Sequence, residues 1–322
     1  MKGNFSVKKI FKSSGSTSTI VSLVIALVVL WIGFALLSPY FLKFNNINNL
    51  LKYSAVDGIA AAGVLIVMIA GGLDLSIGSV VALTGMLIGK FLSFVDIWWL
   101  AIIIGIVAGI LCGSLNAFLI TKIRINNFIT GLGTMTILRG LCYLVNNSLS
   151  VSIFNNSYKF IGQGKVLGVP LLIIIMAVTF AVVGLLLRYT KFGRNVYSIG
   201  GNSRAAYLAG VNVQQQTFLV YMVSGLLAGI AGVCQVSLTA TANPTAATDL
   251  AMEGISAVVL GGASMSGGKG NIIGTILGVL MLGTISNGLT LLNLSQYYQD
   301  IARGAILLFA VGMDMMKNAK SA

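Results

Sequence analysis

Apolar stretches long enough to cross a lipid bilayer follow one another along almost the whole of this 322-residue chain. A helix needs ~20 mostly apolar residues to cross the hydrocarbon core. Here 57% of the residues are apolar and only 8% are charged, whereas a soluble domain carries about 25% charged residues. The sequence therefore predicts an all-α, polytopic membrane protein.

Hydropathy, glycine breaks and a few polar residues divide the chain into about ten transmembrane helices. We expect these spans at about 18 to 38, 54 to 71, 76 to 94, 97 to 120, 127 to 146, 169 to 187, 214 to 236, 251 to 264, 271 to 290 and 298 to 315. The eighth is short for a full crossing. The 39 glycines indicate close-packed helices and permit Gly-rich breaks within them.

The distribution of Lys and Arg favours one orientation in the membrane. With the N-terminus in the cytoplasm, ten spans place 13 Lys and Arg on the cytoplasmic side and only four, Lys43, Lys52, Lys159 and Lys165, on the other. Cytoplasmic loops carry such an excess, so both the N- and C-termini are predicted to be cytoplasmic. The bias also accounts for the net charge of +13 without a nucleic-acid partner.

Ten spans leave room for two tails and nine connections but not for a soluble domain. We divide the chain into a cytoplasmic N-terminal tail (1–17), a single transmembrane domain (18–316) and a cytoplasmic C-terminal tail (317–322). The first run follows four lysines, as a signal peptide does, but it is too long for an h-region and lacks an A-x-A cleavage site. We therefore expect it to remain as a span. The longest connections, 188–213 inside and 147–168 outside, are the predicted docking surfaces.

Residue types that carry most enzyme and metal chemistry are scarce. Histidine is absent, and with it the commonest general base near neutral pH and the commonest metal ligand. Cys112, Cys142 and Cys234 lie singly within apolar runs, without metal-ligand spacing. We expect no catalytic residue, no metal and no cofactor, and an intramembrane enzyme is disfavoured.

The first Gly-rich joint runs from Ala70 to Ser79 and places Asp74 and Ser76 between apolar runs. An intramembrane carboxylate costs ~2.5 to 3.5 kcal/mol on insertion scales, so a compensating interaction is needed. Asp74 or Ser76 can cap the next helix. A capped break that lines a cavity would serve transport equally well.

The second Gly-rich joint runs from Gly261 to Gly270 and superficially resembles a phosphate loop. Ala263 and Gly270 stand where that pattern needs Gly and Ser or Thr, so a tight turn is predicted instead. The two joints echo one another, because Asp57-Gly58-Ile59 leads to one Gly pair and Glu253-Gly254-Ile255 to the other. This similarity between the two joints is compatible with an internal duplication or with chance in a Gly-rich sequence.

Several charged or polar residues in or near the spans have two possible roles. Asp300 and Arg303 are spaced for a local i, i+3 pair. Glu253 and Arg139 are expected to face the bundle or a water-filled path rather than lipid. The segment from Thr239 to Asp249 contains Asn243-Pro244, which predicts a turn but could also contact a hydroxylated solute or a delivering partner.

The inner connection, 188–213, contains a short helix that is not long enough to span. Asn202 or Ser203 can cap a helix through Ala205, Ala206, Tyr207 and Leu208, which Gly210 then ends. Such a helix, held in a basic loop, suits a groove of a soluble partner. An ordinary solvated loop is the alternative.

Three stretches together resemble the ribose-type permeases of bacterial ABC sugar importers. They are 70–79, the run from Gly193-Arg194 through Gly200-Gly201-Asn202 to Gly210, and the run from Asn243-Pro244 through Glu253 to Gly267-Gly268-Lys269-Gly270. The likeness extends in order from about residue 50 to the C-terminus. Between Asn126 and Gly133 the chain departs from the family pattern, which often has Pro before the Phe and Thr in place of Gly131.

The resemblance implies a permease subunit in the bacterial cytoplasmic (inner) membrane that forms the path for a monosaccharide such as ribose. Its implied partners are cytoplasmic ATP-binding subunits, an extracytoplasmic sugar-binding protein, a second permease copy and membrane lipid. The implied ATPase-coupling residues are Gly193, Arg194, Gly200, Gly201, Asn202, Ala205, Ala206, Leu208 and Gly210. The candidate path or gate residues are Gly71, Gly72, Asp74, Ser76, Arg139, Asn243, Pro244, Glu253, Gly261 and Gly262.

One alternative function remains open from the sequence. An ion-coupled secondary transporter of a small polar solute would need intramembrane acids as proton or sodium sites, and Asp74 and Glu253 are the candidates.

Overall fold

The computed structural model describes residues 15–319, which form a bundle of helices with two short strand pairs at one end. The helices are α2 (Gly15–Leu37), α3 (Phe44–Ile69), α4 (Ile77–Leu92), α5 (Trp98–Thr121), α6 (Asn127–Val145), α7 (Asn156–Gln163), α8 (Leu171–Tyr189), α9 (Lys191–Gly201), α10 (Ser203–Leu208), α11 (Val213–Thr239), α12 (Leu250–Leu260), α13 (Ile272–Leu291) and α14 (Gln296–Ala319). Strand β1 (Val151–Ser152) pairs with β4 (Thr241–Ala242), and β2 (Lys165–Val166) with β3 (Val169–Pro170), both antiparallel. Most of the two predicted tails, 1–17 and 317–322, lies outside the described residues.

Seven of the described helices are long and apolar enough to cross a membrane: α2, α3, α5, α6, α8, α11 and α13. This confirms the all-α, polytopic class. Helices α4 and α12 have 16 and 11 residues, which at 1.5 Å per residue is about 24 and 16 Å, less than the ~30 Å of a hydrocarbon core. The third and eighth predicted spans are therefore helices too short for a full crossing, and α12 is only about half the required length.

The second predicted span begins earlier than hydropathy indicates. Helix α3 starts at Phe44, and its first turns are rich in asparagine. Asn46 donates to the carbonyl of Phe41 and exchanges hydrogen bonds with Asn287 on α13. Because these amides are satisfied within the bundle, a polar segment can continue the apolar helix.

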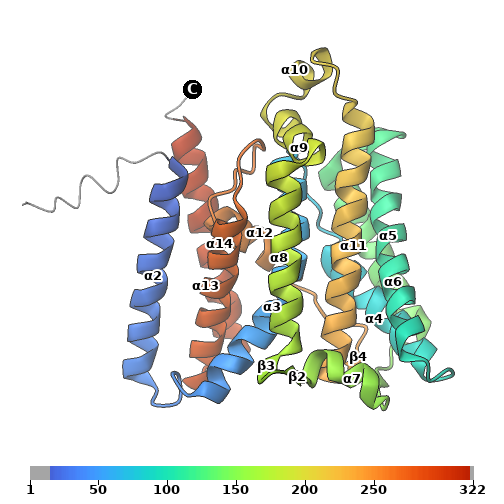
Figure 1. Cartoon of the computed structure of the whole chain (residues 1–322), viewed down its shortest axis with the longest axis vertical. Helices are drawn as coiled ribbons and strands as arrows, with labels where there is room; N and C mark the ends of the chain where they lie inside the picture. The colour runs from blue at the N-terminus through green and yellow to red at the C-terminus, as the bar shows by residue number, and fades with distance from the viewer. Residues whose placement is uncertain (1–14, 320–322) are drawn as a thin grey trace, which may run out of the picture.

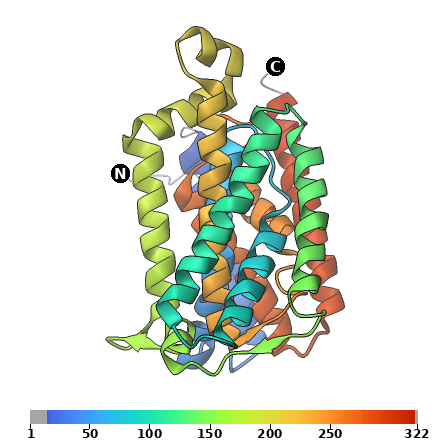
Figure 2. The same cartoon turned by 90° about the vertical axis from the view of Figure 1, so that its right-hand side faces the viewer.

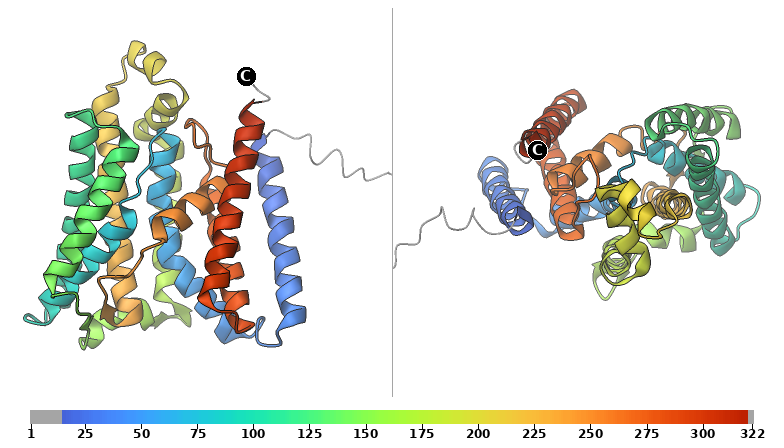
Figure 3. Two further views of the ribbon diagram at one scale, coloured as in Figure 1. Left: turned by 180° about the vertical axis from the view of Figure 1, so that it is seen from behind. Right: turned by 90° about the horizontal axis from the view of Figure 1, so that it is seen from above.

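Helix α3 lies at the centre of the bundle and α2 at its edge. In the most apolar 18-residue window of each helix, 78% of the residues of α3 are buried but only 11% of those of α2. Figure 3 shows α2 and α14 at one edge of the molecule, where each packs against α13. The peripheral helices face outward with apolar side chains, as a lipid environment requires.

Helices α5 and α11 pack backbone to backbone. A Cβ atom added at Gly109 would lie 2.4 Å from the carbonyl oxygen of Gly225, and one added at Gly225 would lie 2.7 Å from the Cα of Gly113. No side chain fits between the helices at these points. This is the glycine-mediated packing that the composition predicts.

The two ends of the bundle differ. The α9–α10 segment lies at one end together with the start of α2 and the end of α14, and α7 and the strands lie at the opposite end (Figure 1). The view turned by 90° shows the same separation (Figure 2). The basic connection 188–213 and both described chain ends therefore share one end.

Candidate functional site

The first Gly-rich joint ends α3 with a Schellman turn. The N–H of Gly71 donates to the carbonyl of Met68 and that of Gly72 to the carbonyl of Val67, both at 2.9 Å. Gly71 has a φ of +80°, which residues with a Cβ rarely adopt. The chain then has no regular secondary structure until α4 begins at Ile77.

Asp74 lies in the core rather than in a cavity. Its side chain is 3% exposed, and Oδ1 accepts hydrogen bonds from the backbone N–H and hydroxyl of Ser76 at 2.9 and 2.6 Å. Asn116 on α5 donates to Ser76 Oγ at 2.8 Å. Asp74 thus orders the turn into α4 and ties it to α5, and neither Asp74 nor Ser76 lines the cavities described below.

The second joint ends α12 with the same turn. The N–H of Gly262 donates to Val259 at 2.9 Å and that of Ala263 to Val258 at 3.1 Å, and Gly262 has a φ of +89°. The residue with the positive φ is Gly71, the first Gly of its pair, in one joint, but Gly262, the second Gly of its pair, in the other. The similarity between the two joints that the sequence indicates is therefore offset by one residue in the structure. The predicted tight turn is confirmed, because Gly267 donates to the carbonyl of Ser264 at 3.1 Å.

A cavity of about 700 Å³ lies between α3, α12, α13 and α14; we call it the bundle cavity. Its charged and amide lining residues are Asp57, Gln235, Asp249, Glu253, Asn287, Gln296 and Arg303. Carboxylates, amides and a guanidinium together supply both donors and acceptors. Such a lining can hydrogen-bond to a small hydroxylated solute.

Arg303 connects two walls of the bundle cavity. Its guanidinium lies 2.5 Å from the carboxylate of Glu253 and 3.6 Å from that of Asp300, and it donates to Ser286 Oγ at 3.0 Å. The predicted local pair with Asp300 is present. The shorter contact, which sequence spacing missed, joins α14 to α12.

Arg139 is hydrogen-bonded to the segment that contains two other candidate residues, Asn243 and Pro244. It donates from α6 to the carbonyls of Pro244 and Ala246, each at 2.8 Å. Asn243 Oδ1 accepts from the backbone N–H and hydroxyl of Thr245 at 2.9 and 2.8 Å, which confirms the predicted turn. Thr245 and the residues that follow line the bundle cavity, so Arg139 fixes the position of one edge of that cavity.

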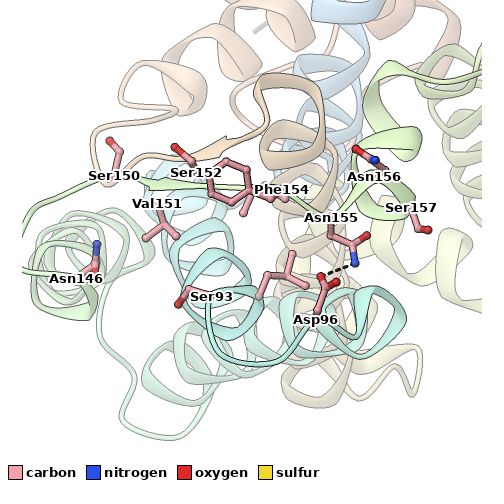
Figure 4. Close-up of a pocket in the computed structure, with 12 residues that line it drawn as sticks. Ser93, Asp96, Asn146, Ser150, Val151, Ser152, Phe154, Asn155, Asn156 and Ser157 are labelled. Atoms are coloured by element: carbon pink, nitrogen blue, oxygen red, sulfur yellow. Dashed lines mark hydrogen bonds between the residues drawn. The ribbon is translucent and has the colours of Figure 1, made fainter.

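A second cavity, of about 790 Å³, lies at the α7 end; we call it the loop cavity. It is formed by the ends of α4 and α6 and by the connection that precedes α7, within the predicted outer docking region. The side chains of Asp96 and Asn155 point toward each other, with a hydrogen bond of 2.6 Å (Figure 4). Phe154 at its rim is 84% exposed. Serine and asparagine make up most of the remaining lining.

The connection 188–213 contains two helices where one was predicted. Asn202 caps α10 by accepting from the N–H of Ala205 at 2.9 Å, and Gly210 follows the helix with a φ of +85°, as predicted. Helix α9 precedes it, and the backbones of Gly193 and Leu187 are in direct contact. Arg194 donates to the carbonyl of Tyr189 at 3.4 Å.

The short helix α10 has an inner and an outer face. Ala206 is buried, whereas Tyr207 and Leu208 are 62% and 74% exposed, and Ala205 is also exposed. Large apolar side chains at the tip of a projecting loop present a contact surface for another protein.

These features define a class of protein. A bundle of apolar helices with two short members next to Gly-rich turns, a polar cavity between helices, and a projecting helical connection is the architecture of a transport subunit. Residues 46–311 match the family described as branched-chain amino acid transport system / permease component. The chain belongs to this family of permeases.

The chain aligns with its curated relatives along nearly their whole length. The chain is 41% identical over 298 residues to the ribose import permease protein RbsC of Bacillus subtilis (strain 168), which covers 92% of each chain. It is 36% identical over 316 residues to the L-arabinose transport system permease protein AraH of Escherichia coli (strain K12), with 98% of this chain and 94% of the relative covered. A probable ABC transporter permease protein, YphD of the same strain, is 35% identical over 301 residues, which cover 94% of this chain and 91% of the relative. No solved structure matches the chain.

The chain is therefore a multi-pass membrane permease of the ribose-type ABC family, a transport component rather than an enzyme. Local sequence signals identified the two joints and α10. They missed α9 and the hydrogen bond from its Tyr197 hydroxyl to the carbonyl of Gly270. They also missed the contacts of Arg303 with Glu253 and of Arg139 with Pro244.

Proposed function

We propose that this chain forms the path of an ATP-driven importer for a monosaccharide, ribose or a similar pentose. The observation that carries the proposal is the near full-length similarity to permeases named for ribose and L-arabinose. The bundle cavity supports it, because its lining offers donors and acceptors for hydroxyl groups.

In this proposal the bundle cavity is part of the translocation path. Glu253 lines it directly, and Arg139 with Asn243 and Pro244 shapes its edge. The Gly pairs at 71–72 and 261–262 end the helices that form its walls, and Asp74 with Ser76 orders the neighbouring turn. A conducting site must bind its solute weakly enough to release it, and an open polar cavity meets that requirement.

The α9–α10 end is the cytoplasmic end in this proposal. It carries the basic connection, and it also carries both described chain ends, in agreement with the excess of positive residues on the cytoplasmic side of bacterial inner-membrane proteins. Ten membrane segments, including the short helices α4 and α12, then place both termini inside. ATP-binding subunits dock on α10 through Tyr207 and Leu208, with Arg204 beside them.

At the opposite end, the loop cavity receives the extracytoplasmic sugar-binding protein. The cavity is large and polar, and exposed Phe154 provides an apolar anchor within a rim of Ser and Asn (Figure 4). Binding surfaces commonly combine an aromatic anchor with a polar rim. A second permease copy completes the path, and lipid covers the apolar helix faces.

Reconstitution in proteoliposomes tests the proposal. The chain, its ATP-binding subunits and its sugar-binding protein are combined, and ATP hydrolysis is measured with ribose, L-arabinose, glucose or no sugar. We expect a pentose to stimulate hydrolysis and to accumulate inside. Sugar uptake by the chain alone, driven by a proton or sodium gradient, would overturn the proposal. No stimulation by a pentose together with stimulation by another solute would overturn the substrate assignment.

A further inference from the structure

Three glycine-containing segments meet at one point near the α9–α10 end of the bundle. The N–H of Gly268, in the second joint, donates to the carbonyl of Ile69 at the end of α3, at 2.9 Å. Gly200, near the end of α9, lies against the same two groups. A Cβ atom added there would come within 2.5 Å of the Gly268 nitrogen and closer still to the Ile69 oxygen.

Gly267 and Gly71 complete this meeting point. A Cβ atom added at Gly267 would lie 2.8 Å from both the Gly200 oxygen and the Gly71 Cα. Gly267 and Gly268 have φ values of +86° and +72°, so the turn itself also favours glycine. We call the set Ile69, Gly71, Gly200, Gly267 and Gly268 the glycine junction.

The contacts in the glycine junction are made by backbone atoms. A side chain can change rotamer to absorb a small displacement, whereas backbone atoms in van der Waals contact must move together or separate. A shift of α9 at Gly200 therefore acts at once on the end of α3 and on the turn that follows α12.

A hydrogen bond next to the junction keeps α9 in register. Tyr197, one turn before Gly200, donates from its hydroxyl to the carbonyl of Gly270 at 2.8 Å. The side chain is half-buried. This bond ties α9 to the second joint independently of the glycine contacts.

Helix α3 ends at the junction and α12 leads into it through the turn 261–268, and both helices carry acids of the bundle cavity. Asp57 lies on α3 and Glu253 on α12, and both line that cavity. At 1.5 Å per residue, Asp57 lies about 18 Å from Ile69 along α3, and Glu253 lies about 10 Å from the end of α12 at Leu260. The stretch from Asp57 to Ile69 is uninterrupted helix. The second path runs from α12 through the turn 261–268, which the hydrogen bond from Gly268 to Ile69 ties to the end of α3.

We propose that the glycine junction is the contact that transmits movement of the docked ATP-binding subunits to the solute cavity. Gly200 is the positioning residue of this linkage, and Tyr197 holds it in place. Movement of α9–α10 displaces α3 and α12 together, so the two acid-bearing walls of the bundle cavity move in one step. The proposal rests on the function proposed above and adds the route by which the energy reaches the solute.

The test compares Gly200→Ala with Gly133→Ala on α6. A Cβ atom at Gly133 meets nothing within 4 Å, so this variant makes the same Gly→Ala change within a helix, away from the junction and from the candidate coupling residues. In proteoliposomes with the ATP-binding subunits and the sugar-binding protein, sugar transported per ATP hydrolysed is measured. We expect Gly200→Ala to lower this ratio about tenfold, because overpacking there penalises one of the two states. Gly133→Ala is expected to match the unaltered protein.

A second readout follows the cavity itself. A cysteine introduced at Thr248, which lines the bundle cavity, is alkylated with and without ATP, against a background in which Cys112, Cys142 and Cys234 are buried. We expect ATP to change the alkylation rate in the unaltered and Gly133→Ala backgrounds but not with Gly200→Ala. Equal ratios and equal ATP responses in the two variants would overturn the linkage.

Tyr197→Phe covers the case in which Gly200→Ala fails to fold. It removes one hydroxyl and adds no atom, and loss of one hydrogen bond is expected to lower the transport-to-hydrolysis ratio about two- to tenfold. An unchanged ratio would overturn the linkage. If the unaltered complex neither hydrolyses ATP in response to a sugar nor transports it, the proposed function fails instead, and the two failures are thus distinguished.

Discussion

The guanidinium of Arg303 on α14 lies 2.5 Å from the carboxylate of Glu253 on α12. The two side chains are only 28% and 19% exposed, and both line the bundle cavity. Removing one partner leaves the other charge poorly solvated, which costs more than the pair itself contributes. The pair therefore fixes the separation of two cavity walls.

We expect Glu253→Gln to lower the free energy of unfolding by about 2 kcal/mol, between the values for exposed and fully buried pairs. Thermal unfolding in detergent measures the effect. The double variant with Arg303→Gln should recover part of the loss. Asp300→Asn is the control, because that carboxylate is 3.6 Å away and 49% exposed, and its cost is expected to stay below about 0.5 kcal/mol. Equal losses for Glu253→Gln and Asp300→Asn would contradict this account.

Arg139 holds the segment 243–249 by its two hydrogen bonds to Pro244 and Ala246. Arg139→Ala leaves both carbonyls without this donor, and hydrogen bonds to charged groups contribute about 1.5–3 kcal/mol each. We expect backbone amides of 245–249 to exchange with deuterium about tenfold faster or more. Arg139→Lys should fall between, because an ammonium lacks the forked geometry. Unchanged exchange in Arg139→Ala would show that the segment is held by other contacts.

Local signals in the sequence were sufficient for the features that depend on neighbouring residues. Asn202 was recognisable as a helix cap because its side chain needs only the N–H of Ala205. The turn at Asn243 and the Gly-rich turns at Gly71 and Gly262 follow from the same kind of short-range geometry. The family resemblance then placed these motifs in a permease.

Other features depend on contacts that hydropathy and spacing do not report. The eighth span was predicted to reach residue 264, because residues 261–264 carry no charge and hardly lower the hydropathy of the segment. The helix nevertheless ends at Leu260, since Gly262 has a positive φ. Helix α9 was missed because Gly193, Gly200 and Gly201 disfavour helix, and packing against Ile69 outweighs that preference. The pairing of Glu253 with Arg303 joins distant parts of the chain, and sequence spacing offered only Asp300.

Docking of the ATP-binding subunits is predicted to depend on Leu208. Its side chain is 74% exposed at the tip of α10, so Leu208→Ser should leave the melting temperature unchanged but weaken binding of those subunits about tenfold or more. Co-purification and titration in detergent measure the affinity. Leu167→Ser is the matched control, because Leu167 is 99% exposed at the opposite end. If both variants bind equally well, α10 is not the docking element.

Ala206 on the same helix should behave differently. It is 5% exposed, so its side chain packs within the connection 188–213 rather than against a partner. Ala206→Leu is therefore expected to destabilise the loop by about 1–3 kcal/mol through overpacking, measured as faster proteolysis within 188–213. Resistance to proteolysis equal to that of the unaltered chain would place Ala206 on the docking face instead.

Gly225 tests the close packing of α5 and α11. A Cβ atom there would lie 2.3 Å from the Gly109 oxygen and 2.7 Å from the Gly113 Cα, so Gly225→Ala must push the two helices apart. We expect a loss of about 1–3 kcal/mol, seen as a lower melting temperature in detergent. Gly133→Ala on α6 is the control, since a Cβ there meets nothing within 4 Å, and alanine in a helix is favoured over glycine by about 0.5–1 kcal/mol. That variant should match or exceed the stability of the unaltered chain, so the two Gly→Ala changes are predicted to have opposite signs. If Gly225→Ala is also neutral, the α5–α11 contact is adjustable and does not fix the bundle.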